Sequence, residues 1–270
     1  MPGFKNDDLG QKLTKPKDVQ EILNEQIEIG LHEHRRSNMG LFLSAFSAGL
    51  EVGFSIFLMS ILYSMFHQTL SPNQMQLLIA SAYPIGFIFV VIGRSELFTE
   101  HTTLAVIPVL AKSASVKSLA VLWTIVYFGN LLGGYLFAIL VGNFAPSMEI
   151  IQAESFAFFA TKLVKFDWEI IIGSSILAGW LMGLLSWLVT SSTETISRIL
   201  IIILITSLIG LGGLHHSIVG SIEVFLGMIT SEEVNFADYL YFQTLTTVGN
   251  AVGGVFFVAI IKYSHTKRDK

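Results

Sequence analysis

Apolar residues dominate six long stretches of the chain, and short polar segments separate each stretch from the next. The stretches cover residues 40–65, 75–111, 118–141, 170–190, 199–229 and 239–262. An α-helix rises 1.5 Å per residue, so about 20 apolar residues cross the roughly 30 Å of hydrocarbon in a bilayer. The pattern therefore predicts an all-α integral membrane protein with six transmembrane helices.

Two short glycine patterns each occur twice. Gly-Asn-x-x-Gly-Gly stands at residues 129–134 and 249–254, and Ala-Gly-x-x-x-Gly stands at residues 48–53 and 178–183. Gly-rich packing motifs are common in membrane helices, so chance is one explanation. The other is an inverted three-plus-three repeat: each half holds three spans, an odd number, so the second half enters the membrane from the opposite side. Such repeats place a functional site near the bilayer midplane.

The second and fifth stretches are interrupted by polar or glycine-rich segments at corresponding positions. Residues 93–101 contain four charged or histidine side chains, and residues 210–217 combine three glycines with two histidines. Irregular backbone at membrane depth is tolerated only where it is buried in protein or lines a cavity. We therefore expect helices two and five to be broken, in an aquaporin-like architecture, with both breaks meeting in the interior.

Composition and charge agree with this picture. Hydrophobic residues make up 52% of the chain and charged residues 13%, whereas soluble domains carry roughly 25% charged residues. Lysine and arginine cluster before the first span and after the last, which by the positive-inside rule places both termini in the cytoplasm. There is no cysteine, which excludes disulfides and thiolate metal sites.

The polar ends divide the chain into three predicted parts. Residues 1–38 form a cytoplasmic segment without the features of a cleavable signal peptide, residues 39–263 form the six-span domain, and residues 264–270 form a cytoplasmic tail. Apolar residues at helical spacing between residues 17 and 36 predict an amphipathic helix. Three placements of this helix are open: on the cytoplasmic membrane surface, packed under the transmembrane domain, or exposed to solvent before the first span.

Several of these residues also resemble a known family. Residues 96–99, Glu-Leu-Phe-Thr, follow Tyr-Pro-Ile-Gly-Phe at residues 83–87, and His-Ser-Ile follows the glycine-rich break at residues 216–218. Together with the two Gly-Asn pairs, this order is similar to the formate/nitrite transporter family over about residues 15 to 265. The resemblance implies a homopentamer in the bacterial inner membrane, with one pore per protomer and no cofactor. Its substrates would be small monovalent anions or their conjugate acids, such as formate, nitrite or hydrosulfide.

The sequence departs from the family pattern at four positions. Arg94 stands where the family usually has a small residue, and His215 stands where it has an acidic residue. Gly179 and Gly220 stand at about the positions of two family asparagines. The resemblance is therefore to a divergent branch, in which substrate and conduction are open questions.

Two histidines and a threonine are candidates for the pore chemistry. His216 matches the family's central histidine, and an imidazole in an apolar wall titrates near physiological pH. The alternative is a packed histidine bonded to a helix carbonyl; His215 alternatively replaces a structural carboxylate. Thr99 would bond an anion through its hydroxyl group, or cap the half-helix that follows.

Apolar rings and one lysine complete the candidate pore. Alignment with the family's constrictions selects five side chains that would exclude bare anions and pass neutral acids, although most apolar residues in membrane helices only pack. These are Tyr83, Phe87, Leu97, Phe98 and Ile209. Lys162 would attract anions at the external mouth, or is an ordinary surface lysine.

Arg94 is the most unusual residue of the second span. A guanidinium near mid-membrane costs about 2.5–3.5 kcal/mol or more unless it is paired or hydrated. Either it attracts anions in the pore, or it forms an ion pair with one of three carboxylates. Glu51 is the first choice, followed by Glu223 and Glu96.

These features favour a pH-dependent membrane channel for small monovalent anions or their weak acids. A proton-coupled secondary transporter and a non-conducting membrane scaffold or sensor are the alternatives, and a water-like pore has little support. The expected partners are the anion, the lipid bilayer and further copies of the chain, and not nucleic acid. Glu100 and His101 lack a third metal ligand, and no motif indicates an enzyme.

Overall fold

Six helices of the computed structural model, which describes residues 16–268, are long and apolar enough to cross a membrane. They are Asn38–Phe66, Pro72–Gly93, Val116–Phe144, Trp168–Ser191, Thr195–Gly212 and Phe236–Arg268. The predicted all-α fold with six spans is confirmed. The expectations for residues 1–15, 269 and 270 lie outside the described part of the chain.

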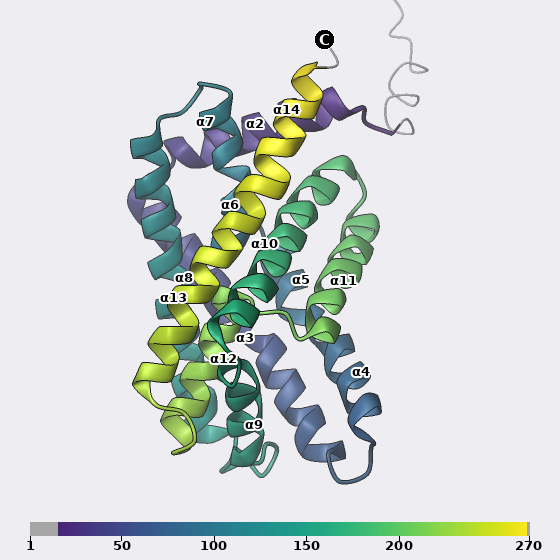
Figure 1. Cartoon of the computed structure of the whole chain (residues 1–270), viewed down its shortest axis with the longest axis vertical. Helices are drawn as coiled ribbons and strands as arrows, with labels where there is room; N and C mark the ends of the chain where they lie inside the picture. Colours follow the sequence, from purple (N-terminus) through teal and green to yellow (C-terminus); the bar gives the residue numbers. More distant parts are fainter. Residues whose placement is uncertain (1–15, 269–270) are drawn as a thin grey trace, which may run out of the picture.

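Each half of the chain contributes an intact helix, a broken helix and a second intact helix (Figure 1). The first half consists of α3 (Asn38–Phe66), α4 (Pro72–Ala82), α5 (Pro84–Gly93), α6 (Phe98–Leu104), α7 (Val106–Leu110) and α8 (Val116–Phe144). The second half consists of α10 (Trp168–Ser191), α11 (Thr195–Gly212), α12 (Ser217–Thr230), α13 (Phe236–Gly254), the π-helix η1 (Val255–Ile260) and α14 (Ile261–Arg268).

The repeated glycines are the points at which helices cross. A Cβ atom added to Gly49 of α3 would lie 2.2 Å from the carbonyl oxygen of Asn130 in α8. At the matching crossing of α10 and α13, a Cβ on Gly179 would lie 2.1 Å from the carbonyl oxygen of Asn250. Only glycine allows backbones to approach this closely. The two patterns therefore mark equivalent crossings, which supports the inverted repeat over a chance match.

Two shorter helices cover opposite ends of the bundle (Figure 1). α2 (Val19–Arg35) packs under the protein against α7 and α10, and the amide of Gln26 donates to the carbonyl oxygen of Ser186 and to Thr190 Oγ1. α9 (Ala153–Val164) packs against α12 at the other end. α9 lies between the third and fourth apolar stretches and is not among the predicted spans, because a 12-residue helix is too short to cross the membrane.

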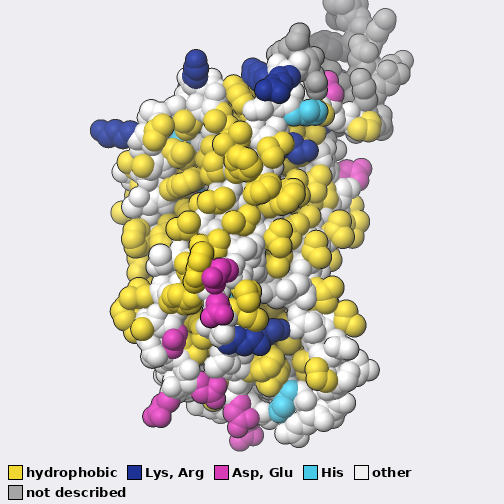
Figure 2. Space-filling model, viewed as in Figure 1, with side chains coloured by type: hydrophobic (Ala, Val, Ile, Leu, Met, Phe, Trp, Pro, Cys, Tyr) yellow, Lys and Arg dark blue, Asp and Glu magenta, His cyan; other side chains and the backbone are white. Residues whose placement is uncertain are grey.

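The surface agrees with a membrane-spanning orientation. Apolar side chains cover the middle of the face shown in Figure 2, and most of the Lys and Arg side chains visible on it stand at the end formed by α2 and α14. Most Asp and Glu side chains visible on this face lie toward the end formed by α9. We refer to these as the α2 end and the α9 end.

Candidate functional site

Both broken helices stop at a residue in the left-handed conformation. Arg94 has φ 60° and follows α5, and Gly213 has φ 58° and follows α11. The next amide closes the same turn in each case: Ser95 N–H donates to Val90 O, and Leu214 N–H donates to Ile209 O, each at 3.0 Å. The breaks are at the predicted positions but are narrower than predicted. They span residues 94–97 and 213–216, because residues 98–101 begin α6 and residues 210–212 complete α11.

One buried asparagine holds each break. Asn130 donates to Ala45 O and Glu96 O, both at 2.8 Å, and accepts from Phe98 N–H. Asn250 donates to Ser175 O at 2.7 Å and His215 O at 3.0 Å, and accepts from Ser217 N–H. Each side chain thus pairs two backbone groups that the broken helix leaves without a helical partner, and ties them to a carbonyl group of an intact neighbouring helix. We call these two side chains the asparagine clamps.

His216 and Thr99 join the two breaks. His216 Nε2 lies 2.8 Å from Thr99 Oγ1, and both side chains are buried. Val219 N–H donates to His216 Nδ1 at 3.2 Å, so the proton of the neutral ring is on Nε2 and is donated to the threonine. The Thr99 hydroxyl hydrogen is then the next donor in this chain. The ring of Phe87 meets His216 edge-on at 5.3 Å.

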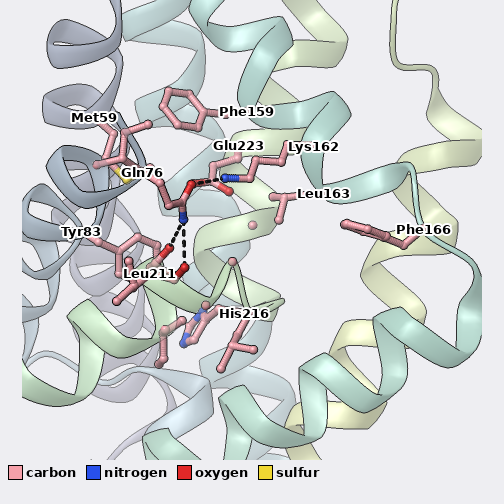
Figure 3. Close-up of a pocket in the computed structure, with 17 residues that line it drawn as sticks. Met59, Gln76, Tyr83, Phe159, Lys162, Leu163, Phe166, Leu211, His216 and Glu223 are labelled. Atoms are coloured by element: carbon pink, nitrogen blue, oxygen red, sulfur yellow. Dashed lines mark hydrogen bonds between the residues drawn. The ribbon is translucent and has the colours of Figure 1, made fainter. Parts of the chain in front are cut away.

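A cavity of about 280 Å³ reaches His216 from the α9 end (Figure 3). Its walls are mainly apolar and include Met59, Ile79, Tyr83, Phe159, Ile209 and Leu214. Its polar groups are Gln76, Lys162 and Glu223, together with His216 at its base.

Lys162 lies in the wall of this cavity, where α9 meets the broken span. Its ammonium group donates to Gln76 Oε1 at 2.6 Å, and the Gln76 amide donates to Gly210 O at 2.9 Å and Leu211 O at 3.1 Å (Figure 3). Burial lowers the pKa of Lys162, and the nearby Glu223 carboxylate opposes this effect. The lysine is therefore part of the cavity and not an ordinary surface side chain.

The five predicted constriction residues divide into two groups. Tyr83 and Ile209 line the cavity. Phe87, Leu97 and Phe98 are buried but do not line it. Phe98 packs against the rings of Trp123 and Tyr127 in α8, at 5.8 and 5.0 Å. A constricting role for Phe87, Leu97 and Phe98 stays a prediction.

His215 is held by the frame of the second break and does not line the cavity. Its Nδ1 lies 2.8 Å from Ser174 Oγ, and its Nε2 lies 3.1 Å from Leu163 O at the end of α9. Because both ring nitrogens are engaged with neighbouring helices, the geometry favours the structural alternative for this histidine.

The predicted ion pair of Arg94 is wrong. Among residues 16–268, Arg94 forms no salt bridge with Glu51, Glu96 or Glu223, and its side chain is exposed. Spacing along the chain placed it near these carboxylates. The left-handed backbone at the helix end instead leaves its side chain on the surface.

The three carboxylates have other surroundings. Glu96 pairs with Arg36 at 2.6 Å and with His101 at 2.5 Å. Glu51 Oε1 accepts from Ser47 at 2.7 Å and from Ser95 at 3.0 Å. Glu223 lines the cavity. Arg36 was missed because it precedes the first span, and no local pattern shows that it reaches the second.

Gln76 was also missed. It stands near the start of the second span, where a polar residue is ordinary, so its position in the cavity depends on the packing of α4 against α11. The asparagine clamps were visible as repeated Gly-Asn pairs, but the pairs do not reveal which backbone groups their amides meet.

Gly179 and Gly220, which the resemblance sets at about the positions of two family asparagines, are closely packed. At Gly179 an added Cβ would lie 2.1 Å from Asn250 O, and at Gly220 it would lie 2.4 Å from the ring of Phe242. Neither position has room for an asparagine side chain in this packing. The two glycines are therefore required by the way the surrounding helices pack.

A family model described as formate/nitrite transporter matches residues 20–264. The chain belongs to this family. Its relatives include the inner membrane protein YfdC of Escherichia coli, 30% identical over 89% of this chain and 79% of the relative. The formate channel FocA of Haemophilus influenzae is 24% identical over 86% and 89% of the two chains. The nitrite transporter NirC of Salmonella typhimurium is 24% identical over 82% and 81%.

Solved structures show the same fold. An ion channel of the formate/nitrite transporter family superposes with a TM-score of 0.80 at 21% identity, covering 91% of this chain and 99% of the other. A pentameric formate channel with formate bound has a TM-score of 0.70 at 21% identity, covering 86% and 98%. The protein is thus a multi-pass membrane transport protein with the six-helix fold of this family.

Proposed function

We propose that the protein is a pH-dependent channel through which small monovalent anions cross the membrane as their conjugate weak acids. Formate, nitrite and hydrosulfide are the candidate substrates. The observation that carries the proposal is the His216–Thr99 hydrogen bond, which joins the two breaks at the base of the cavity. The names of the relatives from Haemophilus and Salmonella support the same class of substrate.

The cavity supports a path that begins at the α9 end. An anion that enters beside Lys162 is attracted by the positive charge of its ammonium group and then meets walls that are mostly apolar. A bare anion is costly in such surroundings, whereas its neutral acid is not. Protonation before passage beyond His216 therefore lowers the barrier, and the Thr99 hydroxyl group is positioned to donate to the crossing oxygen.

Orientation and assembly belong to the proposal as well. The basic residues at the α2 end would face the cytoplasm under the positive-inside rule, which puts the cavity on the outer side. The pentameric formate channel supports a homopentamer, and large apolar side chains exposed on α8, including Leu132, Leu136 and Leu140, would face lipid or a neighbouring protomer. Native mass spectrometry in mild detergent tests the subunit number, and a monomer or dimer would contradict it.

Flux into proteoliposomes tests the function. We expect faster uptake of formate or nitrite at pH 5.5 than at pH 7.5, above the rate of protein-free liposomes. His216→Leu and Thr99→Val should each slow uptake about tenfold to a hundredfold, because each leaves the buried polar group of its partner unpaired, which costs about 1–3 kcal/mol. His32→Gln, on the exposed face of α2, is the matched control. Unchanged uptake in well-folded His216→Leu would reduce His216 to a packing residue.

The same assay separates the alternative functions. Accumulation against a gradient that collapses with an uncoupler would indicate a proton-coupled secondary transporter. Absence of flux for formate, nitrite, hydrosulfide and acetate would indicate a non-conducting scaffold. Arg94 does not line the cavity, so it does not supply the plug that the scaffold alternative requires there.

A further inference from the structure

Glu223 is an acidic side chain in the cavity for which the proposed path has no role yet. It lies in α12 seven residues after His216, and both residues line the cavity together with Gly220. The side chain is 7% exposed. Among residues 16–268 its carboxyl group has no hydrogen-bond or salt-bridge partner within contact distance. Figure 3 shows it beside Lys162, whose ammonium group is bonded to Gln76.

The protonation state of Glu223 decides the charge that an incoming anion meets. When the carboxyl group is ionised, its charge cancels that of Lys162. When it is protonated, the charge of Lys162 is unopposed, and the acid O–H has no hydrogen-bond acceptor among residues 16–268. A buried carboxylate without hydrogen bonds is unfavourable, whereas a protonated one is ready to donate to an oxygen of a ligand.

We propose that Glu223 is the residue that protonates the anion in the cavity, so that anion and proton enter the channel as a pair. The inference rests on the proposed function. The O–H bond of the Glu223 carboxyl group breaks and leaves its electron pair on the carboxylate. The proton forms a new O–H bond on the anion, giving the neutral acid. A hydronium ion from the solution at the α9 end then protonates Glu223 and becomes water, and nothing is oxidised or reduced.

The other titratable groups around α12 are less suited to this step. His216 uses Nε2–H on Thr99 of α6, and its Nδ1 accepts from Val219. Lys162 of α9 is bonded to Gln76. Tyr83 shares the cavity, but a phenol is a much weaker acid than a carboxyl group.

On the remaining sides, none of the titratable groups in the described part of the chain competes with Glu223. Tyr135 of α8 and Tyr239 of α13 are hydrogen-bonded to each other, and α3 presents Met59 to the cavity. Glu223 is therefore the acid that has a proton to give and no protein group to receive it.

The decisive measurement separates the apparent KM from the maximal rate in proteoliposomes supplied with formate or nitrite. In the wild type, the apparent KM should rise about tenfold between pH 5.5 and pH 7.5 as the cavity loses its net positive charge. In Glu223→Gln the positive charge is permanent and the acid proton is gone. Its apparent KM should therefore stay low at both pH values while its maximal rate falls about tenfold.

Glu232→Gln is the matched control, because it makes the same change at an exposed position of the α9 end. It should keep the wild-type KM profile and rate. If Glu223→Gln also keeps both, the role of Glu223 is overturned while the proposed function stands. If the wild type transports neither anion, the proposed function and this inference fail together.

A second measurement does not depend on the folding of Glu223→Gln. Infrared difference spectra of the wild type on addition of formate should show loss of a protonated carboxyl signal, and Glu223→Asp should shift that signal. Absence of any carboxyl change in the wild type would overturn the inference.

Discussion

The two breaks have the same backbone and different side chains. A left-handed residue and an asparagine clamp define both. The side chains at equivalent positions of the two breaks nevertheless differ. The pairs, first break before second, are Arg94 and Gly213, Glu96 and His215, and Leu97 and His216. In the first break, Glu96 is tied to Arg36, just beyond α2. In the second, His215 is tied to Leu163 at the end of α9.

This comparison separates what builds the fold from what performs the chemistry. Glycine contacts and amide hydrogen bonds are repeated in both halves, so they specify the frame. The polar group of the second break, His216, has the apolar Leu97 as its counterpart, so the pore centre is asymmetric. The backbone frame is therefore the same in both halves, whereas only the second half supplies the histidine at the pore centre. Equivalent substitutions in the frame should lower the stability of the protein by the same amount in either half.

The asparagine clamps should give the largest effect. Asn130→Ala and Asn250→Ala each leave one N–H and one carbonyl group of a break without that partner and also remove a hydrogen bond to a neighbouring helix, and each buried unpaired group costs about 1–3 kcal/mol. We expect both variants to lose most of their folded protein, measured by size-exclusion chromatography in detergent and by thermal unfolding. Asn143→Ala, at an exposed position of α8, is the control. A large loss in only one variant would break the equivalence of the two halves.

Substitutions at the helix crossings should give the second-largest loss of stability. Gly49→Ala and Gly179→Ala push a Cβ atom against a backbone carbonyl oxygen, and overpacking of this kind costs about 1–3 kcal/mol. Both variants should unfold at lower temperature than the wild type, by similar amounts. Gly173→Ala has nothing within 4 Å of its Cβ and should be neutral or slightly stabilising. Tolerance at Gly49 together with damage at Gly179 would show that the crossings differ.

Loss of the ion pair between Arg36 and Glu96, which anchors the first break, should lower the stability by a smaller amount. Arg36→Gln removes the ion pairs of two mostly buried carboxylates, Glu96 and Glu33, and leaves them only the histidine partners His101 and His32. Because Arg36 is partly exposed, we expect a loss of about 1–2 kcal/mol, seen as a lower unfolding temperature. Arg35→Gln changes the exposed neighbour and serves as the control. Equal unfolding temperatures for the two variants would show that the anchor adds nothing.

The smallest effect should have the opposite sign. Arg94 has φ 60° and no ion pair among residues 16–268, so Arg94→Gly relieves left-handed strain and should stabilise the protein by about 1 kcal/mol. Arg94→Ala removes the charge but keeps the strain, so it should not stabilise. A destabilised Arg94→Gly would reveal a partner outside the single protomer.

The frame was largely predictable because it depends on local chemistry. Span length follows from hydrocarbon thickness, and polar interruptions in spans two and five are too costly to face lipid. The repeated glycines indicate close crossings wherever they lie. These features need no knowledge of which helices are neighbours.

The site was less predictable because its contacts join distant parts of the chain. The partner of Glu96 is 60 residues away, and that of His215 Nε2 is 52 residues away. Spacing in the sequence suggested Arg94 instead of Arg36, since it does not show which way a helix end turns a side chain. The roles of His216, Thr99 and Lys162, the cytoplasmic location of the termini and the predicted segment boundaries stay predictions.

The asparagine clamps also make the fold sensitive to deamidation at Asn130 and Asn250. Each clamp uses two N–H donors and one oxygen acceptor, and an aspartate of the same size offers only acceptors when ionised. Deamidation of Asn130 or Asn250 would therefore set a buried carboxylate against two carbonyl oxygens. Replacement of a single amide group by a carboxylate would thus open a break, so the fold has little tolerance for this change at either position.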